Sequence, residues 1–196
     1  MRVISFVRLL ALLGLAVVLS GCGGGPQVAS QSDITALSQR IQALDPAIDR
    51  IEADRAAQIA YSYTRQLAME YQITDPPLIH NTKVNLGIKP RGLCWHWAED
   101  MERRLKAEGF QTLSMHRAIA NADNPWRIDH STAIISARGD DMYAGIVLDP
   151  WREGGRLFWD NIEADTRYEW RPRAVVLAEK RGRLLEEGGL PAAAFE

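Results

Sequence analysis

The chain has 196 residues, of which 23 are Lys or Arg and 25 are Asp or Glu, giving a formal net charge of −2 at pH 7. Basic residues are not concentrated in any segment, which argues against nucleic acid as a partner. The sequence after residue 21 is long enough for one domain with a hydrophobic core and leaves little room for a second. We therefore expect a single domain over residues 33–196.

Residues 1–21 have the pattern of an export signal. A basic start with Arg2 and Arg8 precedes an apolar run over 9–19, which is too short for a membrane-spanning helix. The run ends in Leu19-Ser20-Gly21-Cys22, which resembles the box of bacterial lipoprotein signal peptides. The resemblance implies cleavage before Cys22 and attachment of acyl chains, palmitate among them, to its thiol. An ordinary secretory peptide with a coincidental cysteine is the alternative.

The segment after the signal is rich in Gly, Ser and Gln, and we predict a flexible tether over residues 22–32. Gly23 stands where an aspartate would retain a Gram-negative lipoprotein in the inner membrane. The resemblance therefore implies a protein anchored in the bacterial cell envelope, at the outer membrane and facing the periplasm. In such an oxidising compartment Cys94, the one thiol without lipid, has no partner for an internal disulfide.

Helices are predicted first along the chain. Asp33 can cap a short helix, and Asp45-Pro46 is a typical start for a long second helix that extends to about Gln72. Asp75-Pro76-Pro77 ends that helix. The polar segment over 78–91, interrupted by glycine and proline, is predicted to be a surface loop.

A further helix is predicted from Cys94 to just before Gly109, and strands follow it. Strand-like segments cover residues 111–118, 128–137 and 142–148, with 156–159 as a candidate fourth and a helix over 173–187. The turn at Arg138-Gly139-Asp140-Asp141 predicts that the middle two strands form a hairpin. Helices followed by an antiparallel sheet indicate an α+β fold.

Cys94 lies in the first turn of its helix and on the apolar face, in line with Trp97, Met101 and Leu105. The unsatisfied amides and the positive end of the helix dipole at this position favour a thiolate over a thiol. These are the local conditions that a nucleophilic cysteine needs.

Cys94 at a helix start, His130 on a following strand and Asp149 before Pro150 on the next resemble the transglutaminase-like branch of the papain-like superfamily of cysteine peptidases. The similarity covers about residues 93–159. It implies a core in which the cysteine helix packs on an antiparallel sheet. It also implies a triad in which Cys94 attacks a carbonyl carbon, His130 transfers the proton and Asp149 orients the imidazole.

Oxyanion stabilisation would come from the backbone amide of Cys94 and one side-chain donor. Papain-like peptidases use an upstream glutamine for this, but no glutamine occupies the loop before Cys94, so Asn81 or Asn85 would have to serve. His96 would face away from Cys94 on a helix and is not expected to be the base. Three tryptophans flank the candidate residues and could line a cleft: Trp95, Trp126 and Trp151.

Each candidate also has a purely structural interpretation. Cys94 could fill the core as a small apolar residue, His130 could be a hydrogen-bonded strand residue, and Asp149 could cap a turn. His80 and His116 are the reserve bases. No ligand spacing such as Cys-x-x-Cys or His-x-x-x-His occurs, so we expect neither a metal nor another cofactor.

The sequence thus predicts an envelope lipoprotein that acts as a thiol-dependent amide hydrolase or acyltransferase through Cys94, His130 and Asp149. The candidate substrates are a peptide, a protein or peptidoglycan. The alternative is a catalytically inactive transglutaminase-like lipoprotein that binds or scaffolds at the cell envelope.

Overall fold

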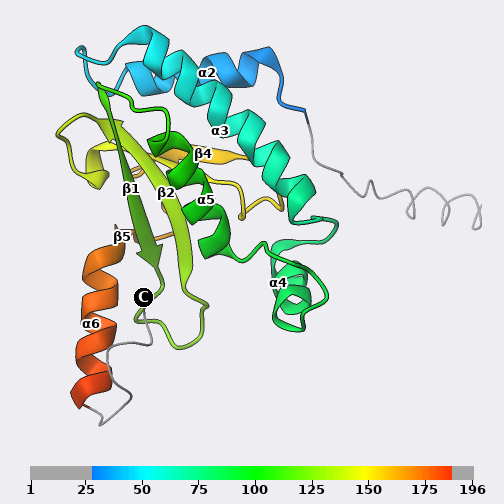
Figure 1. The fold of residues 1–196 in the computed structure, drawn as a ribbon. Helices are drawn as coiled ribbons and strands as arrows, with labels where there is room; N and C mark the ends of the chain where they lie inside the picture. The colour runs from blue at the N-terminus through cyan, green and yellow to red at the C-terminus, as the bar shows by residue number, and fades with distance from the viewer. Residues whose placement is uncertain (1–27, 187–196) are drawn as a thin grey trace, which may run out of the picture.

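The computed structural model describes residues 28–186, so Cys22, the signal peptide and the first part of the expected tether lie outside the described residues. Over this range the chain has five α-helices and a five-stranded antiparallel sheet (Figure 1). The expected α+β class is confirmed. The helices come first and the strands later, with one last helix at the end.

Two antiparallel helices form the outer layer, α2 (Gln31–Gln42) and α3 (Arg50–Glu70). The first begins three residues earlier than expected, because Ser30 caps it and Asp33 lies inside its first turn. The expected start of the second helix at Asp45-Pro46 is wrong. Asp49 is the true cap, and its carboxylate accepts a hydrogen bond from the amide of Glu52 at 3.0 Å.

The expected loop over 78–91 is wrong in its first half, which forms α4 (Pro77–Asn85). Pro77 occupies the first helical turn, where its missing amide hydrogen costs nothing, so a residue interpreted as a helix stop is a helix start. Large apolar side chains of this helix and of its C-cap residue face solvent: Leu78 and Ile79 in the helix and Leu86 at the cap. Because they form no buried stripe, the sequence shows no helical period here.

The sheet has the strand order β4-β3-β2-β1-β5, and each neighbouring pair is antiparallel. The strands are β1 (Leu113–Ala120), β2 (His130–Ala137), β3 (Ile146–Asp149), β4 (Phe158–Asn161) and β5 (Arg171–Pro172). The expected hairpin of the strands over 128–137 and 142–148 is present as the antiparallel pair of β2 and β3, although the turn at 138–141 joins them through a short helix.

That short helix corrects the expected strand over 142–148. The first residues of the expected strand instead form the 3-10 helix η1 (Met142–Ala144). The carboxylate of Asp141 accepts a hydrogen bond from the amide of Tyr143 at 2.8 Å and tightens the turn. The strand β3 therefore starts only at Ile146.

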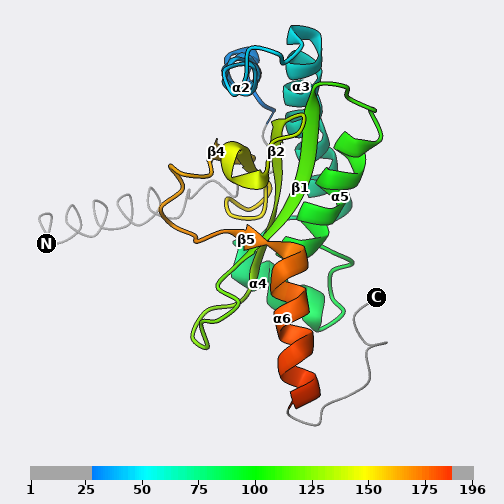
Figure 2. The ribbon, with the colours of Figure 1, turned by 90° about the vertical axis from the view of Figure 1, so that its left-hand side faces the viewer.

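The central helix α5 (Cys94–Lys106) packs on β2, and α3 packs on α5. Alternate residues of β2 face opposite ways: Ile135 lies in the core under α5 with Met101, whereas Ile134 lies in a second core on the far face with Trp170. The last helix, α6 (Arg173–Glu186), continues from β5 beyond the end of the sheet (Figure 2). This packing fixes the start of α5 over the start of β2.

Candidate active site

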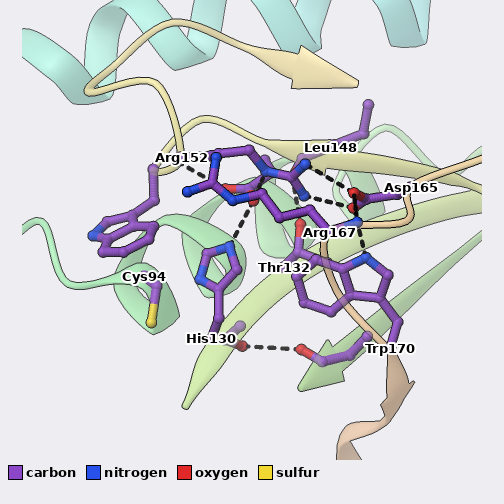
Figure 3. Close-up of polar contacts among 12 residues, drawn as sticks. Cys94, His130, Thr132, Leu148, Arg152, Asp165, Arg167 and Trp170 are labelled. Carbon is purple, nitrogen blue, oxygen red and sulfur yellow. Dashed lines mark hydrogen bonds and ion pairs between the residues drawn. The ribbon is translucent and has the colours of Figure 1, made fainter. Parts of the chain in front are cut away.

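Three element ends bring the predicted triad together. Cys94 is the first residue of α5, His130 is the first residue of β2 and Asp149 is the last residue of β3. Figure 3 shows the Cys94 side chain next to the ring of His130, and the same ring is hydrogen-bonded to the carboxylate of Asp149. All three side chains are buried.

His130 and Asp149 form a tight buried pair. The Nε2–H group of His130 donates a hydrogen bond to Oδ2 of Asp149 at 2.6 Å, and each side chain is 1% exposed. Because Ala133 pairs with Leu148, Asp149 is level with Thr132 and diagonal to His130 on the same face of the sheet. The expected contact between these two residues is therefore present.

The charges of this pair reinforce each other. Burial opposes a charged imidazole, but the carboxylate of Asp149, its hydrogen bond and the nearby Cys94 together raise the pKa of His130 to about 9. Burial also opposes a charged Asp149, but His130 and then Arg152 outweigh it and hold its pKa below the usual value. At neutral pH the pair is therefore an imidazolium and a carboxylate.

The second ring nitrogen of His130 is unengaged. Within residues 28–186, its Nδ1 is buried and has no hydrogen-bond partner. The thiol of Cys94 instead donates to the backbone carbonyl of Asp129 at 3.5 Å, although it lies close enough to contribute to the raised pKa of His130.

The helix start at Cys94 is held by His96, a role that the sequence did not indicate. The amides of Gly92 and Leu93 donate to Nδ1 of His96 at 3.1 and 3.2 Å. Burial and then the charge of Arg91 lower the pKa of His96 to about 4, so the ring is neutral and accepts these bonds. As expected, it is not placed as a base.

This arrangement leaves two backbone donors free beside the sulfur. The amides of Cys94 and Trp95 in the first turn of α5 have no hydrogen-bond partner within the described part of the chain. Unsatisfied amides at a helix start carry partial positive charge and can stabilise an anion. They can therefore receive the negative charge of an oxyanion.

A second ion pair supports Asp149 from behind. The guanidinium of Arg152 donates to Oδ2 of Asp149 at 3.0 Å through Nε, and to both carboxylate oxygens of Asp165 at 3.0 and 2.6 Å. Trp170 donates to the same Asp165 at 2.8 Å. Sequence reasoning missed these residues. Arg152 follows Asp149 closely enough to have been noticed, but nothing local marks Asp165.

Aromatic rings enclose the imidazole. The ring centroids of Trp151, Tyr168 and Trp170 lie 4.7, 4.6 and 5.3 Å from that of His130. Of the tryptophans expected to line a cleft, Trp151 is buried in this wall, whereas Trp126 is 92% exposed and Trp95 is 45% exposed. The enclosure limits the access of water to the imidazole.

The two asparagines proposed as oxyanion donors have different surroundings in the fold. Oδ1 of Asn81 accepts a hydrogen bond from the indole of Trp151 at 3.0 Å, so α4 brings this residue to the aromatic wall. Asn85 is exposed at the end of the same helix. The reserve bases are engaged elsewhere: His80 bonds the carbonyl of Arg91 and His116 bonds Ser136.

No group of three or more metal-ligating side chains occurs among the described residues. Within the same range, no helix is both long and apolar enough to cross a membrane. The chain matches no model of a protein family, no curated protein and no solved structure. The chemistry of the site must therefore be argued from its own geometry.

Proposed function

We propose that the chain is a cell-envelope lipoprotein with a transglutaminase-like core that acts as a thiol-dependent amide hydrolase or acyltransferase. Cys94 would be the nucleophile, His130 the acid and base, and Asp149 the residue that orients and charges the imidazole. No cofactor is needed for this chemistry. The lipid anchor at Cys22 is proposed from the sequence alone.

One observation carries the proposal. The imidazole of His130 is held by Asp149 through Nε2 at 2.6 Å, and its other nitrogen is buried, unpartnered and adjacent to the only cysteine of the described range. A buried polar atom without a partner costs free energy, so its retention beside a thiol favours a function for it. His80 also has a buried Nδ1 without a partner, so the feature that distinguishes His130 is the position of its Nδ1 beside the thiol of Cys94.

The acylation step follows from these positions. The thiolate of Cys94 attacks the carbonyl carbon of an amide, and the carbonyl electron pair moves to oxygen, where the amides at the start of α5 stabilise the charge. The oxyanion collapses, the C–N bond breaks, and Nδ1–H of His130 protonates the departing amine. The products are a thioester on Cys94, a free amine and a neutral imidazole.

The second step regenerates the thiolate. Neutral His130 accepts a proton from water or from an amine, which attacks the thioester carbon and expels the sulfur of Cys94. Water gives a carboxylic acid and an amine gives a new amide. The aromatic wall around His130 restricts water, so transfer to an amine stays a candidate beside hydrolysis.

A second candidate is a binding or scaffolding lipoprotein with an inactive triad. It is favoured by the burial of Cys94, which is 7% exposed in an apolar cluster with Tyr71, Trp97 and Trp151. A cysteine in that setting can act as a small core residue. Reactivity of the thiol in the folded chain separates the two candidates.

The test is acylation by p-nitrophenyl acetate, an activated ester that needs no knowledge of the natural substrate. We expect rapid acetylation of Cys94, located by peptide mass spectrometry, and loss of that label in Cys94→Ala. His130→Ala should slow acetylation about a hundredfold. Added hydroxylamine then reports transfer as hydroxamate, against acetate from hydrolysis. Absence of acetyl-Cys94 in the folded chain would favour the scaffold.

A further inference from the structure

A cavity of about 470 Å³ reaches the proposed triad at His130 and is lined in part by that residue and by Trp151, whereas Cys94 and Asp149 are not among its lining residues. Its outer walls come from two other segments of the chain. The start of α4 supplies one side, and the loop between β1 and β2 supplies the other. A ligand in this cavity would therefore lie against the ring that moves the proton.

The outer wall of the cavity is apolar and open to solvent. Three large apolar side chains line it while remaining exposed: Leu78 at 61%, Trp126 at 92% and Ile128 at 49%. Scattered exposed apolar residues need no explanation, but three that converge on one cavity next to a candidate active site indicate a binding surface.

Two cations complete the lining. Arg127 and Arg167 both border the cavity, and their guanidinium carbons lie 5.2 and 5.6 Å from the ring centroid of Tyr168. Neither forms an ion pair within the described residues. By contrast, Arg152, which also lines the cavity, is fully used by Asp149 and Asp165.

The acidic side chains near this loop do not neutralise the two arginines. Asp123 pairs with Arg171 and Arg183, and Asp129 pairs with Lys180. Glu169 borders a neighbouring hollow that Arg127 shares, but it makes no ion pair with that arginine. Two unpaired guanidiniums over one aromatic ring, beside an apolar wall, are complementary to a carboxylate next to an apolar group.

We propose that this cavity binds an extended peptide in which an acidic side chain adjoins an apolar one. The carboxylate would lie at Arg127 and Arg167, and the apolar side chain would pack against Leu78, Trp126 and Ile128. This inference rests on the proposed function, since it takes the cavity to be the substrate site of the triad. It restricts the candidate substrates to acidic peptide segments.

The test measures binding without turnover, in the full chain carrying Cys94→Ala and held in detergent. Two pools of acetylated and amidated hexapeptides are mixed in equal amounts, with Leu-Glu or Leu-Gln fixed in the middle and the other positions randomised. Peptides retained by the immobilised protein are counted by mass spectrometry. We expect the Leu-Glu pool to be enriched about tenfold.

The arginines decide the result. The enrichment of the Leu-Glu pool should fall to near unity in the double variant Arg127→Gln/Arg167→Gln. It should persist in the control variant Arg50→Gln, because Arg50 is an exposed arginine at the start of α3 and lies outside the cavity. In Arg127→Glu/Arg167→Glu the preference should reverse toward a Leu-Lys pool, which shows that the variant still folds and binds. Replacing Leu by Ser in the peptides should weaken retention of both pools.

Three outcomes would overturn the inference. These are equal retention of the Leu-Glu and Leu-Gln pools, an enrichment that survives the double arginine substitution, and stronger retention of a phosphoserine pool, which would assign the cations to a phosphate. Failure of the triad reads out separately. If enrichment of the Leu-Glu pool depends on Arg127 and Arg167 but Cys94 of the wild-type chain is never acetylated, the peptide-binding role of the cavity is supported. The scaffolding function is then favoured over the catalytic one.

Discussion

His130 and Asp149 meet diagonally across β2 and β3, with Nε2 of the imidazole 2.6 Å from Oδ2 of the carboxylate. The hydrogen bond fixes which ring nitrogen faces the carboxylate and leaves Nδ1 on the side of Cys94. The same carboxylate also accepts two hydrogen bonds from Arg152, one from its backbone amide and one from its side chain, so Arg152 as well as His130 fixes the position of Asp149. The protonation state of the ring depends on this carboxylate.

Asp149→Asn should convert His130 from a charged ring to a neutral one at pH 7. Burial opposes the charged ring, and the carboxylate is the largest influence that raises the pKa of His130 to about 9; without that charge only the smaller contributions of Cys94 oppose burial, and the pKa falls. NMR titration of the ring checks this shift. Acetylation of Cys94 should fall by about a hundredfold to ten-thousandfold, since the amide favours the wrong tautomer.

The same pair makes the stability of the fold depend on pH. Because the folded pKa of His130 lies above its unfolded value, its contribution is fully present below about pH 6.5 and is lost as pH rises through 9. Asp149→Asn should flatten that loss in thermal unfolding between pH 7 and 10. An unchanged titration of His130 in the variant would mean that Asp149 does not control the ring.

Arg152→Lys should destabilise the fold by about 2–4 kcal/mol. The guanidinium bridges Asp149 and Asp165, is 4% exposed and lies 3.8 Å from the centroid of the Phe158 ring, a geometry that an ammonium cannot reproduce. Urea unfolding measures the difference. Arg156→Lys is the matched control, because its pair with Glu153 is exposed and is worth about 0.5 kcal/mol or less. Equal effects at the two sites would contradict the account.

Gly92→Ala should displace the start of α5 and lower the reactivity of Cys94. Gly92 has φ +125°, and a Cβ there would lie 2.4 Å from Nε2 of His80. Gly109→Ala at the other end of α5 has φ +69° and open space, so it should cost only backbone strain of about 1–2 kcal/mol. The rate of alkylation of Cys94 in both variants distinguishes the effect of backbone strain from the effect of displacing the start of α5. Similar rates in Gly92→Ala and Gly109→Ala would show that the loop before α5 does not control the reactivity of the thiol.

The α+β order and the helix start at Cys94 could be predicted because they depend on local signals, namely apolar period, caps and turn residues. The contact between His130 and Asp149 followed from the same reasoning, since the spacing matches two adjacent antiparallel strands. The α4 helix was missed because its apolar side chains are exposed and its prolines were interpreted as a stop. Asp165 was missed because it reaches Arg152 only through tertiary packing.

Cys22→Ser should release the protein from the membrane fraction or leave it unprocessed. Acyl chains at residue 22 would hold the protein at the membrane. Within the described residues, no helix is long and apolar enough to cross one. Detergent phase partitioning of the wild type and the variant measures the change, with Cys94→Ser as the control that removes the other thiol. Identical partitioning of wild type and Cys22→Ser would remove the lipid anchor from the account.

The most direct measurement of the central claim is the rate of alkylation of Cys94 by iodoacetamide in the folded chain at pH 6. The imidazolium that Asp149 maintains to about pH 9 should keep the sulfur reactive there, and His130→Ala should slow the reaction about tenfold or more. His116→Ala, which removes a histidine bonded to Ser136 on another part of the sheet, should leave the rate unchanged. The account predicts fast labelling that depends on His130; a Cys94 that reacts only after denaturation would contradict it.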